Sequence, residues 1–185
     1  MDITNLKSQY ASCTLCPELV ACRTNVVFGV GNPHARVMII GEAPGATEDE
    51  QGEPFVGRSG QLLTELLSSI GLSRDDVFIT NTILCRPPEN RNPRPEELRN
   101  CRSRLDQTIA IINPKVIITL GNFATKYVLN AKEGITTLRG KPQKKDGRTI
   151  LPMYHPAVLV YNGNKGPRRE EMEKDFHVLK TLLNH

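Results

Sequence analysis

The segment between residues 41 and 60 is rich in residue types that surround bound ligands. Its sequence, GEAPGATEDEQGEPFVGRSG, contains five glycines and five carboxylates but no lysine. A phosphate-binding P-loop needs a GK[ST] sequence, whose lysine contacts the phosphates. Here Glu42 follows Gly41 directly. The segment is therefore predicted to bind something other than a nucleoside triphosphate.

Four of the five cysteines have a spacing that suits a metal centre. Cys13 and Cys16 form a C-x2-C pair, while Cys85 and Cys101 are 16 positions apart. Four thiolates can bind a tetrahedral zinc ion or a 4Fe-4S cluster. Zinc more often has a second close pair, so the pattern favours a cluster, and buried free cysteines are the alternative. Cys22 remains as a core residue or a spare ligand.

The elements that must position these residues follow from short apolar runs. Runs at 36–41, 77–85 and 115–121 predict buried parallel strands, and residues 149–156 are expected to form a fourth strand. Expected helices lie between or after them, at 59–71, 94–114, 122–130 and 167–185. This alternation predicts an α/β fold, a three-layer α/β/α sandwich with a central, mostly parallel four-stranded sheet. We expect residues 1–185 to form a single domain.

Polar residues gather where the predicted strands end. GEAPG follows the first strand, Asn81 lies in the second, and YHP at 154–156 ends the fourth. Ligands of parallel sheets bind at the carboxyl ends of the strands. The ligand site is therefore predicted along this one edge of the sheet.

The joint occurrence of four motifs resembles the family 4 uracil-DNA glycosylases. These motifs are GEAPG (41–45), EPFVGRSGQLL (53–63), NTILCRPPENRNP (81–93) and YHP (154–156), in addition to the cysteines. The resemblance covers nearly the whole chain. It implies a base excision repair enzyme that hydrolyses the N-glycosidic bond of uracil in single- or double-stranded DNA and leaves an abasic site.

The resemblance also implies a cofactor. A 4Fe-4S cluster would be held by Cys13, Cys16, Cys85 and Cys101, in a region formed by the N-terminal segment and residues 85–101. We expect this cluster to have a structural or DNA-positioning role.

A flipped uracil would be recognised by stacking and by an amide. Phe55 would stack on the base, and the backbone of Gly41, Glu42 and Ala43 would line one edge of it. The Asn81 amide could accept from uracil N3-H and donate to O4, whereas cytosine presents the reverse pattern. The alternatives are an ordinary core phenylalanine and an asparagine that satisfies backbone groups at a strand bend.

Catalysis is expected to depend on His155 and Glu42. A histidine donor aimed at uracil O2 would stabilise the negative charge that develops on the leaving base. Glu42 would orient water or stabilise the sugar cation, unless it is a structural hydrogen-bonding residue. Asp49 is a distant second candidate for this role.

Two segments are expected to contact DNA. Arg58 and Ser59 precede a predicted helix, whose N-terminus can take a phosphate. The segment 155–169 resembles a loop that inserts an apolar side chain into the base stack, with Val158 or Leu159 as the wedge. The basic residues beside it are expected to hold phosphates, unless they form only the solvated start of a helix: Lys165, Arg168 and Arg169.

Composition agrees with a soluble DNA-binding protein. Residues 132–169 contain nine Lys/Arg and two acidic residues, which suits either an anionic partner or a solvated surface. The sequence has no apolar run long enough to span a bilayer and no signal peptide pattern, so we expect a cytoplasmic monomer without membrane contact. A non-catalytic iron-sulfur redox or nucleic-acid-binding module and a zinc protein of nucleotide metabolism are the competing interpretations.

Overall fold

The structure is a computed structural model that describes residues 2–161, 163 and 165–184. In this part of the chain, six strands form one sheet in the order β1-β3-β2-β4-β6-β5. They are β1 (Val30–Gly31), β2 (Val37–Gly41), β3 (Val77–Asn81), β4 (Val116–Leu120), β5 (Gln143–Lys145) and β6 (Arg148–Met153). The four inner strands are parallel, while β1 and β5 are antiparallel to their neighbours at the edges.

The prediction of a four-stranded sheet was therefore wrong in the number of strands, because it missed the two edge strands. The inner four strands are the four that apolar runs predicted. The edge strands β1 and β5 have two and three residues, and neither has a continuous apolar run. Edge strands bury less surface than inner strands, so hydrophobic patterning does not reveal them.

Helices cover both faces of the sheet, which confirms the α/β/α sandwich. They are α1 (Ile3–Tyr10), α2 (Pro17–Cys22), α3 (Ala46–Gln51), α4 (Arg58–Ser69), α5 (Pro95–Ile112), α6 (Gly121–Leu129), α7 (Ile135–Leu138), α8 (Ala157–Val160) and α9 (Pro167–Leu183). Two short 3-10 helices, η1 (Arg74–Asp76) and η2 (Pro88–Asn90), lie in the connections.

Alternate residues of each inner strand enter two separate cores. In β2, Ile39 packs into the core formed with α4, α8 and α9, whereas Met38 and Ile40 pack into the core formed with α1, α5 and α6. This alternation is the two-residue period of a strand whose faces are both covered. The sheet is therefore held rigidly from both sides.

The strand register places the predicted ligand residues beside one another. Gly41 at the end of β2 pairs with Asn81 at the end of β3, and Leu120 in β4 pairs with Met153 in β6. The segments that follow these positions therefore leave the sheet at a common edge.

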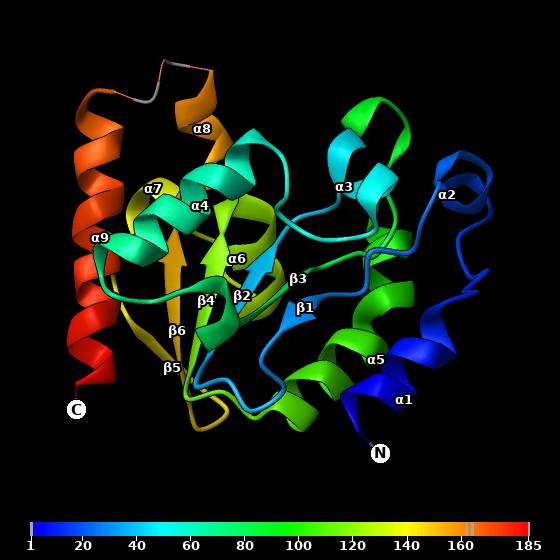
Figure 1. Cartoon of the computed structure of the whole chain (residues 1–185), viewed down its shortest axis with the longest axis horizontal. Coiled ribbons are helices and arrows are strands. Elements are labelled where there is room, and N and C mark those ends of the chain that lie inside the picture. The colour runs from blue at the N-terminus through cyan, green and yellow to red at the C-terminus, as the bar shows by residue number, and fades with distance from the viewer. Residues whose placement is uncertain (1, 162, 164, 185) are drawn as a thin grey trace.

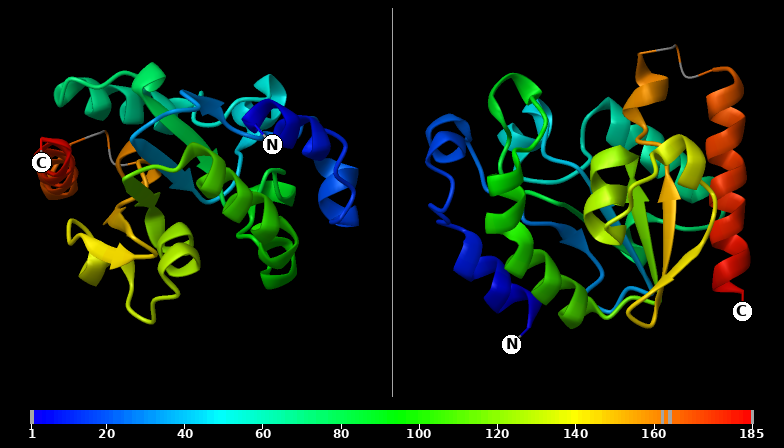
Figure 2. Two further views of the ribbon diagram at one scale, coloured as in Figure 1. Left: turned by 90° about the horizontal axis from the view of Figure 1, so that it is seen from below. Right: turned by 180° about the vertical axis from the view of Figure 1, so that it is seen from behind.

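The N-terminal helices lie far from the C-terminal helix. Figures 1 and 2 show α1 and α2 with α5 at one end of the molecule and α9 at the other. Helix α1 packs directly on α5, which brings the N-terminal cysteines towards the helix that contains Cys101. Within the described residues, no helix has the length and apolar character needed to cross a membrane.

Candidate active site

A cavity of about 380 Å³ lies at the carboxyl ends of the inner strands. Phe55, Asn81 and His155 all line it, together with Glu42 and Ala43. The volume is within the range of about 300 to 1,000 Å³ typical of small-molecule sites. The structure therefore brings the base-binding residues predicted from the sequence into one cavity.

Asn81 presents an unused hydrogen-bond acceptor. The residue is only 2% exposed, and within the described chain its side-chain oxygen Oδ1 has no hydrogen-bond partner. A buried acceptor without a partner destabilises a protein by about 1 to 3 kcal/mol. An N-H group of a ligand would remove this penalty, so Oδ1 is suited to accept from one.

Gly41 makes room for this amide. A Cβ atom at position 41 would lie 2.5 Å from Asn81 Oδ1 and 2.6 Å from Phe55 Cζ. Only glycine allows the β2 backbone to approach both groups so closely. The glycine that opens the GEAPG motif is thus required by packing in the site.

Phe55 has an unusual backbone that two hydrogen bonds hold in place. Its φ is +55°, a conformation that bulky residues rarely adopt. Arg74 donates to the carbonyl oxygens of Phe55 (2.9 Å) and Pro54 (2.8 Å). The ring is 6% exposed and lies 5.6 Å from the His155 ring, centroid to centroid. Phe55 is therefore both a core residue, as the alternative interpretation held, and a wall of the cavity.

His155 is held as a neutral hydrogen-bond donor. Its Nδ1 accepts from the backbone N-H of Ala157 at 3.1 Å. Burial lowers the pKa of the imidazole to about 4, and the nearby carboxylate of Glu48 only partly opposes this shift. At neutral pH the ring is therefore uncharged, and with Nδ1 acting as an acceptor its proton is on Nε2.

The two glutamates of the cavity are in different environments. Glu42 lines the cavity, and burial raises the pKa of its carboxyl group above the ordinary value. Glu48 was not predicted as a site residue; its Oε1 accepts from the N-H groups of Val56 (3.1 Å) and Gly57 (2.9 Å). Glu48 thus fixes the turn that follows Phe55. Its position in the acidic run of residues 48–53 was the signal available in the sequence.

Asp49 does not contribute to the cavity, so the secondary prediction for this residue was wrong. It is 3% exposed, and Oδ1 accepts from the N-H groups of Thr24 (2.9 Å) and Asn25 (3.1 Å). These hydrogen bonds fix the segment that precedes β1, which is a structural role. In the helix α3, adjacent residues point in different directions, so Glu48 and Asp49 cannot face the same site.

Arg58 and Ser59, which were predicted to contact DNA, lie at the start of α4 beside the cavity. Ser59 lines the cavity, and Arg58 is exposed at the first turn of α4, with Nη2 donating to Val160 O at 3.5 Å. Val158 is half-buried against the core, whereas Leu159 is fully buried in it. The prediction of Leu159 as a wedge was therefore wrong, because α8 uses this side chain to pack on the core.

Tyr161 was missed by the sequence analysis. It directly follows α8, is 86% exposed, and lines a shallow hollow with Arg58 and Ser59. The only signal in the sequence was an aromatic residue just after the apolar stretch AVLV.

The three basic residues after α8 are not equivalent. Lys165 and Arg168 are exposed, and the Arg168 guanidinium lies 5.7 Å from the centre of the Tyr154 ring. Arg169 forms ion pairs with Glu173 (2.6 Å) and Glu65 (3.7 Å). For Arg169 the structure therefore favours a structural role at the start of α9.

The four predicted metal ligands lie in one region. Cys85 and Cys101 are buried, and Cys13 and Cys16 are half-buried. Burial raises the pKa of Cys85 to about 11 against the opposing effect of Arg23, and Cys101 and Cys13 contribute to the increase. Burial likewise raises the pKa of Cys16, with contributions from Cys101 and Cys13. The thiols therefore lie within electrostatic reach of one another.

Four cysteine thiols in one region form a donor set that suits a thiolate-bound centre. Among the described residues, no group of three or more His, Cys, Asp or Glu side chains is arranged to hold a single metal ion. A zinc site requires all four sulfurs about 2.3 Å from one point, whereas a 4Fe-4S cluster bonds each thiolate to a different iron. Arg23 and Asn100 donate to the sulfurs of Cys85 (3.1 Å) and Cys16 (3.3 Å), as polar groups around a thiolate cluster would.

Cys22 differs from these four cysteines in its exposure. It is exposed, and its Sγ lies 3.2 Å from the carbonyl oxygen of Arg86. The interpretation of Cys22 as a core residue was therefore wrong.

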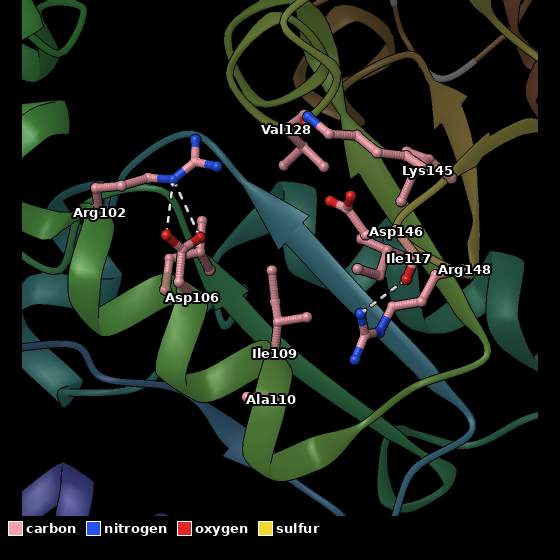
Figure 3. A pocket seen from close by; sticks show the side chains of 11 residues that line it. Arg102, Asp106, Ile109, Ala110, Ile117, Val128, Lys145, Asp146 and Arg148 are labelled. Atoms are coloured by element: carbon pink, nitrogen blue, oxygen red, sulfur yellow. Dashed lines mark hydrogen bonds and ion pairs between the residues drawn. The ribbon is translucent and has the colours of Figure 1, made fainter.

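A second cavity, of about 310 Å³, lies between α5 and the β5–β6 hairpin (Figure 3). Apolar side chains such as Ile109 and Ile117 form part of its wall, and the ion pair of Arg102 with Asp106 lies at one side. None of the site residues predicted from the sequence lines it. The cavity at the strand ends is therefore the candidate active site.

Comparison with known proteins agrees with this fold and site. Residues 28–180 match the profile of the uracil DNA glycosylase superfamily. A type-4 uracil-DNA glycosylase of Sulfurisphaera tokodaii is 43% identical over 98% of this chain and 84% of its own length. One of Thermotoga maritima is 47% identical over 92% of this chain and 89% of its own length. A type-5 uracil-DNA glycosylase of Thermus thermophilus is 34% identical over 70% of this chain and 73% of its own length.

The chain belongs to the uracil DNA glycosylase superfamily and, within it, to the type-4 uracil-DNA glycosylases.

Proposed function

We propose that this protein is a DNA repair enzyme that hydrolyses the N-glycosidic bond of uracil in DNA. It releases free uracil and leaves an abasic site, as the type-4 relatives' name implies. One observation carries the assignment: an unpaired amide oxygen, an aromatic ring and a neutral imidazole share one cavity. These are the groups that an extruded pyrimidine requires.

Uracil recognition depends on the Asn81 amide. Oδ1 accepts from uracil N3-H, and the amide NH₂ donates to O4. Cytosine would place an acceptor and a donor at the opposite positions, so both hydrogen bonds would be lost and buried polar groups would remain unpaired. Phe55 stacks on the base, and the backbone of residues 41–43 borders its edge.

Bond cleavage depends on His155. As the C1'-N1 bond breaks, negative charge accumulates on the base, and Nε2-H donates to O2. In this half-buried position water competes little for the donor, and the hydrogen bond to O2 becomes stronger in the transition state. Glu42 faces the sugar side, where its carboxylate orients the attacking water or stabilises the sugar cation.

DNA is held beside the cavity by exposed groups. Arg58 and Ser59 take a phosphate at the N-terminus of α4, where the helix dipole is positive. Lys165 and Arg168 take further phosphates. Val158 and the exposed ring of Tyr161 lie where a side chain would fill the space left by the extruded base.

Cys13, Cys16, Cys85 and Cys101 would hold a 4Fe-4S cluster. These four cysteines would then link the N-terminal segment to α5 and to the segment after β3, which is a structural role. All five cysteines are free thiols in the structure, which agrees with a reducing cytoplasm. We further propose that the enzyme acts as a monomer.

A uracil release assay tests this function. Wild-type protein should release uracil from single- and double-stranded oligonucleotides, whereas Asn81→Ala and His155→Ala should each reduce the rate about 100-fold or more. Asn122→Ala and His177→Ala are matched controls, because these side chains lie outside the cavity and should leave the rate unchanged. A wild-type protein without uracil release would contradict the proposal and favour a non-catalytic binding or redox module.

A further inference from the structure

The largest fully buried side chain of the described residues is a cation, Arg104 in α5. Its Nη2 donates to the carbonyl oxygens of Asn81 (2.8 Å) and Thr82 (3.0 Å), and its Nη1 donates to Thr80 Oγ1 (3.2 Å). One guanidinium therefore fixes three successive residues at the end of β3. The middle residue is Asn81, whose side-chain amide lines the cavity.

Arg104 also contacts the cysteine site. It lies three residues after Cys101, and residues with this spacing are neighbours on one face of a helix. Cys101 and Arg104 are both among the buried residues of α5. Arg104 thus lies directly between a predicted cluster ligand and the strand that forms the wall of the cavity.

The charge of Arg104 has no carboxylate partner among the described residues. Each of its three hydrogen bonds goes to a neutral oxygen. A buried charge is strongly destabilising unless an opposite charge compensates it. Four thiolates on a cluster carry net negative charge, and Cys101 is the one that shares the buried face of α5 with this cation.

The segment after β3 connects the same two regions through the backbone. Thr82 N donates to Gly41 O (2.9 Å), and Thr82 Oγ1 donates to Glu42 O (2.5 Å). Cys85 follows only three residues later, where Arg23 donates to its sulfur. This short segment therefore touches the cavity at one end and the cysteine site at the other, and Arg104 holds its beginning.

We propose that Arg104 is a positioning residue that couples the cysteine site to the uracil cavity by fixing the end of β3. The inference rests on the proposed function, since it assigns the coupling to the same uracil site. Its guanidinium is stabilised by the negative charge of the loaded cysteine site and in turn holds the Asn81 amide in place. Occupation of the cavity by uracil and retention of the cluster must then favour each other, because coupling between two sites is reciprocal.

Cluster loss in the wild-type holoenzyme tests this coupling without any substitution. An iron chelator is added, and the visible absorbance is followed with and without a saturating oligonucleotide. The oligonucleotide carries uracil on a 2'-fluorinated deoxyribose, because the fluorine slows bond cleavage. A second oligonucleotide has thymine in place of uracil. We expect loss to be about tenfold slower with the uracil oligonucleotide than with the thymine one.

Two variants of the holoenzyme then test the residue. Arg104→Met should abolish the difference in the rate of cluster loss between the two oligonucleotides. It should also weaken binding of the uracil oligonucleotide about tenfold. Arg104→Lys keeps the charge but not the planar fork, so it should restore part of the difference. Thr108→Val is the matched control: it removes a buried hydroxyl of the same helix that accepts nothing from β3 and donates only to Arg104 O. It should retain the full difference.

Three results would overturn the proposal. They are equal protection of the wild-type cluster by both oligonucleotides, no protection by either, and an Arg104→Met protein that keeps the wild-type difference. The first two require no variant, so a misfolded Arg104→Met protein does not prevent the test. Uracil release by the same wild-type preparation separates the proposed function from the proposed coupling. A protein that releases uracil, but whose cluster uracil DNA does not protect, contradicts only the coupling.

Discussion

At the scale of single residues, burial in one cavity shifts the pKa values of two titratable groups in opposite directions. His155 is neutral because burial lowers the pKa of its imidazole to about 4. Glu42 is held near the same cavity, and burial raises the pKa of its carboxyl group. The carboxylate must be ionised and the imidazole neutral for the proposed chemistry. As the pH falls, the raised pKa of Glu42 makes its carboxylate the first of the two groups to lose the form that this chemistry needs.

This order predicts the acidic side of the pH-rate profile. The rate should fall as the pH decreases through the raised pKa of Glu42, above the ordinary value for a glutamate. Glu42→Gln should lower the rate at pH 7 about 100-fold and should move the remaining decline to about pH 4, where His155 becomes protonated. Single-turnover uracil release between pH 3.5 and pH 8 measures both effects. An unchanged acidic limb in Glu42→Gln would show that another group controls it.

At the scale of elements, α8 divides its residues between the core and the surface. Leu159 packs into the core with α4 and α9, so the helix has a fixed rotation about its axis. That rotation leaves Tyr161, just beyond its end, 86% exposed. An aromatic ring exposed beside the cavity suits contact with stacked bases, which is typically worth about 1 to 3 kcal/mol per base.

Substitution of this ring should affect duplex DNA most. Tyr161→Ala should slow uracil release from double-stranded DNA about tenfold, because a duplex must be unstacked before the base can leave. Release from single strands should change little, since less stacking is lost there. Tyr161→Phe keeps the ring and should behave like the wild type. Equal losses on both substrates would instead indicate a general contact with the DNA backbone.

At the scale of the whole molecule, distant parts of the chain meet at the cysteine site. Cys13 and Cys16 precede the sheet, while Cys85 follows β3 and Cys101 is in α5. Two buried contacts already join them: Leu6 and Leu19 pack into the core that contains Cys85 and Cys101. A bound cluster would close this long loop and stabilise the docking of the N-terminal helices.

Loss of one ligand should therefore release the N-terminal segment while the sheet remains folded. Cys101→Ser should lose the visible absorbance near about 400 nm, and proteolysis within residues 1–25 should become about tenfold faster. Cys22→Ser is the matched control, because Cys22 is exposed and is not one of the four proposed ligands. It should keep both the absorbance and the resistance. A colourless Cys101→Ser protein with wild-type resistance would show that packing alone docks the segment.

Hydrophobic patterning and local motifs were sufficient for much of this protein. Continuous apolar runs predicted the four inner strands, because a strand buried on both faces needs them. The motifs at the strand ends predicted the cavity residues, because parallel strands bring their carboxyl ends to one edge. Only the tertiary structure decided which neighbouring side chain faces which surface. The rotation of a short helix against the core decides each case. It sets the different directions of Glu48 and Asp49, the burial of Leu159 and the exposure of Tyr161. The position of Arg104 between two sites likewise depends on packing between elements that are distant in the sequence.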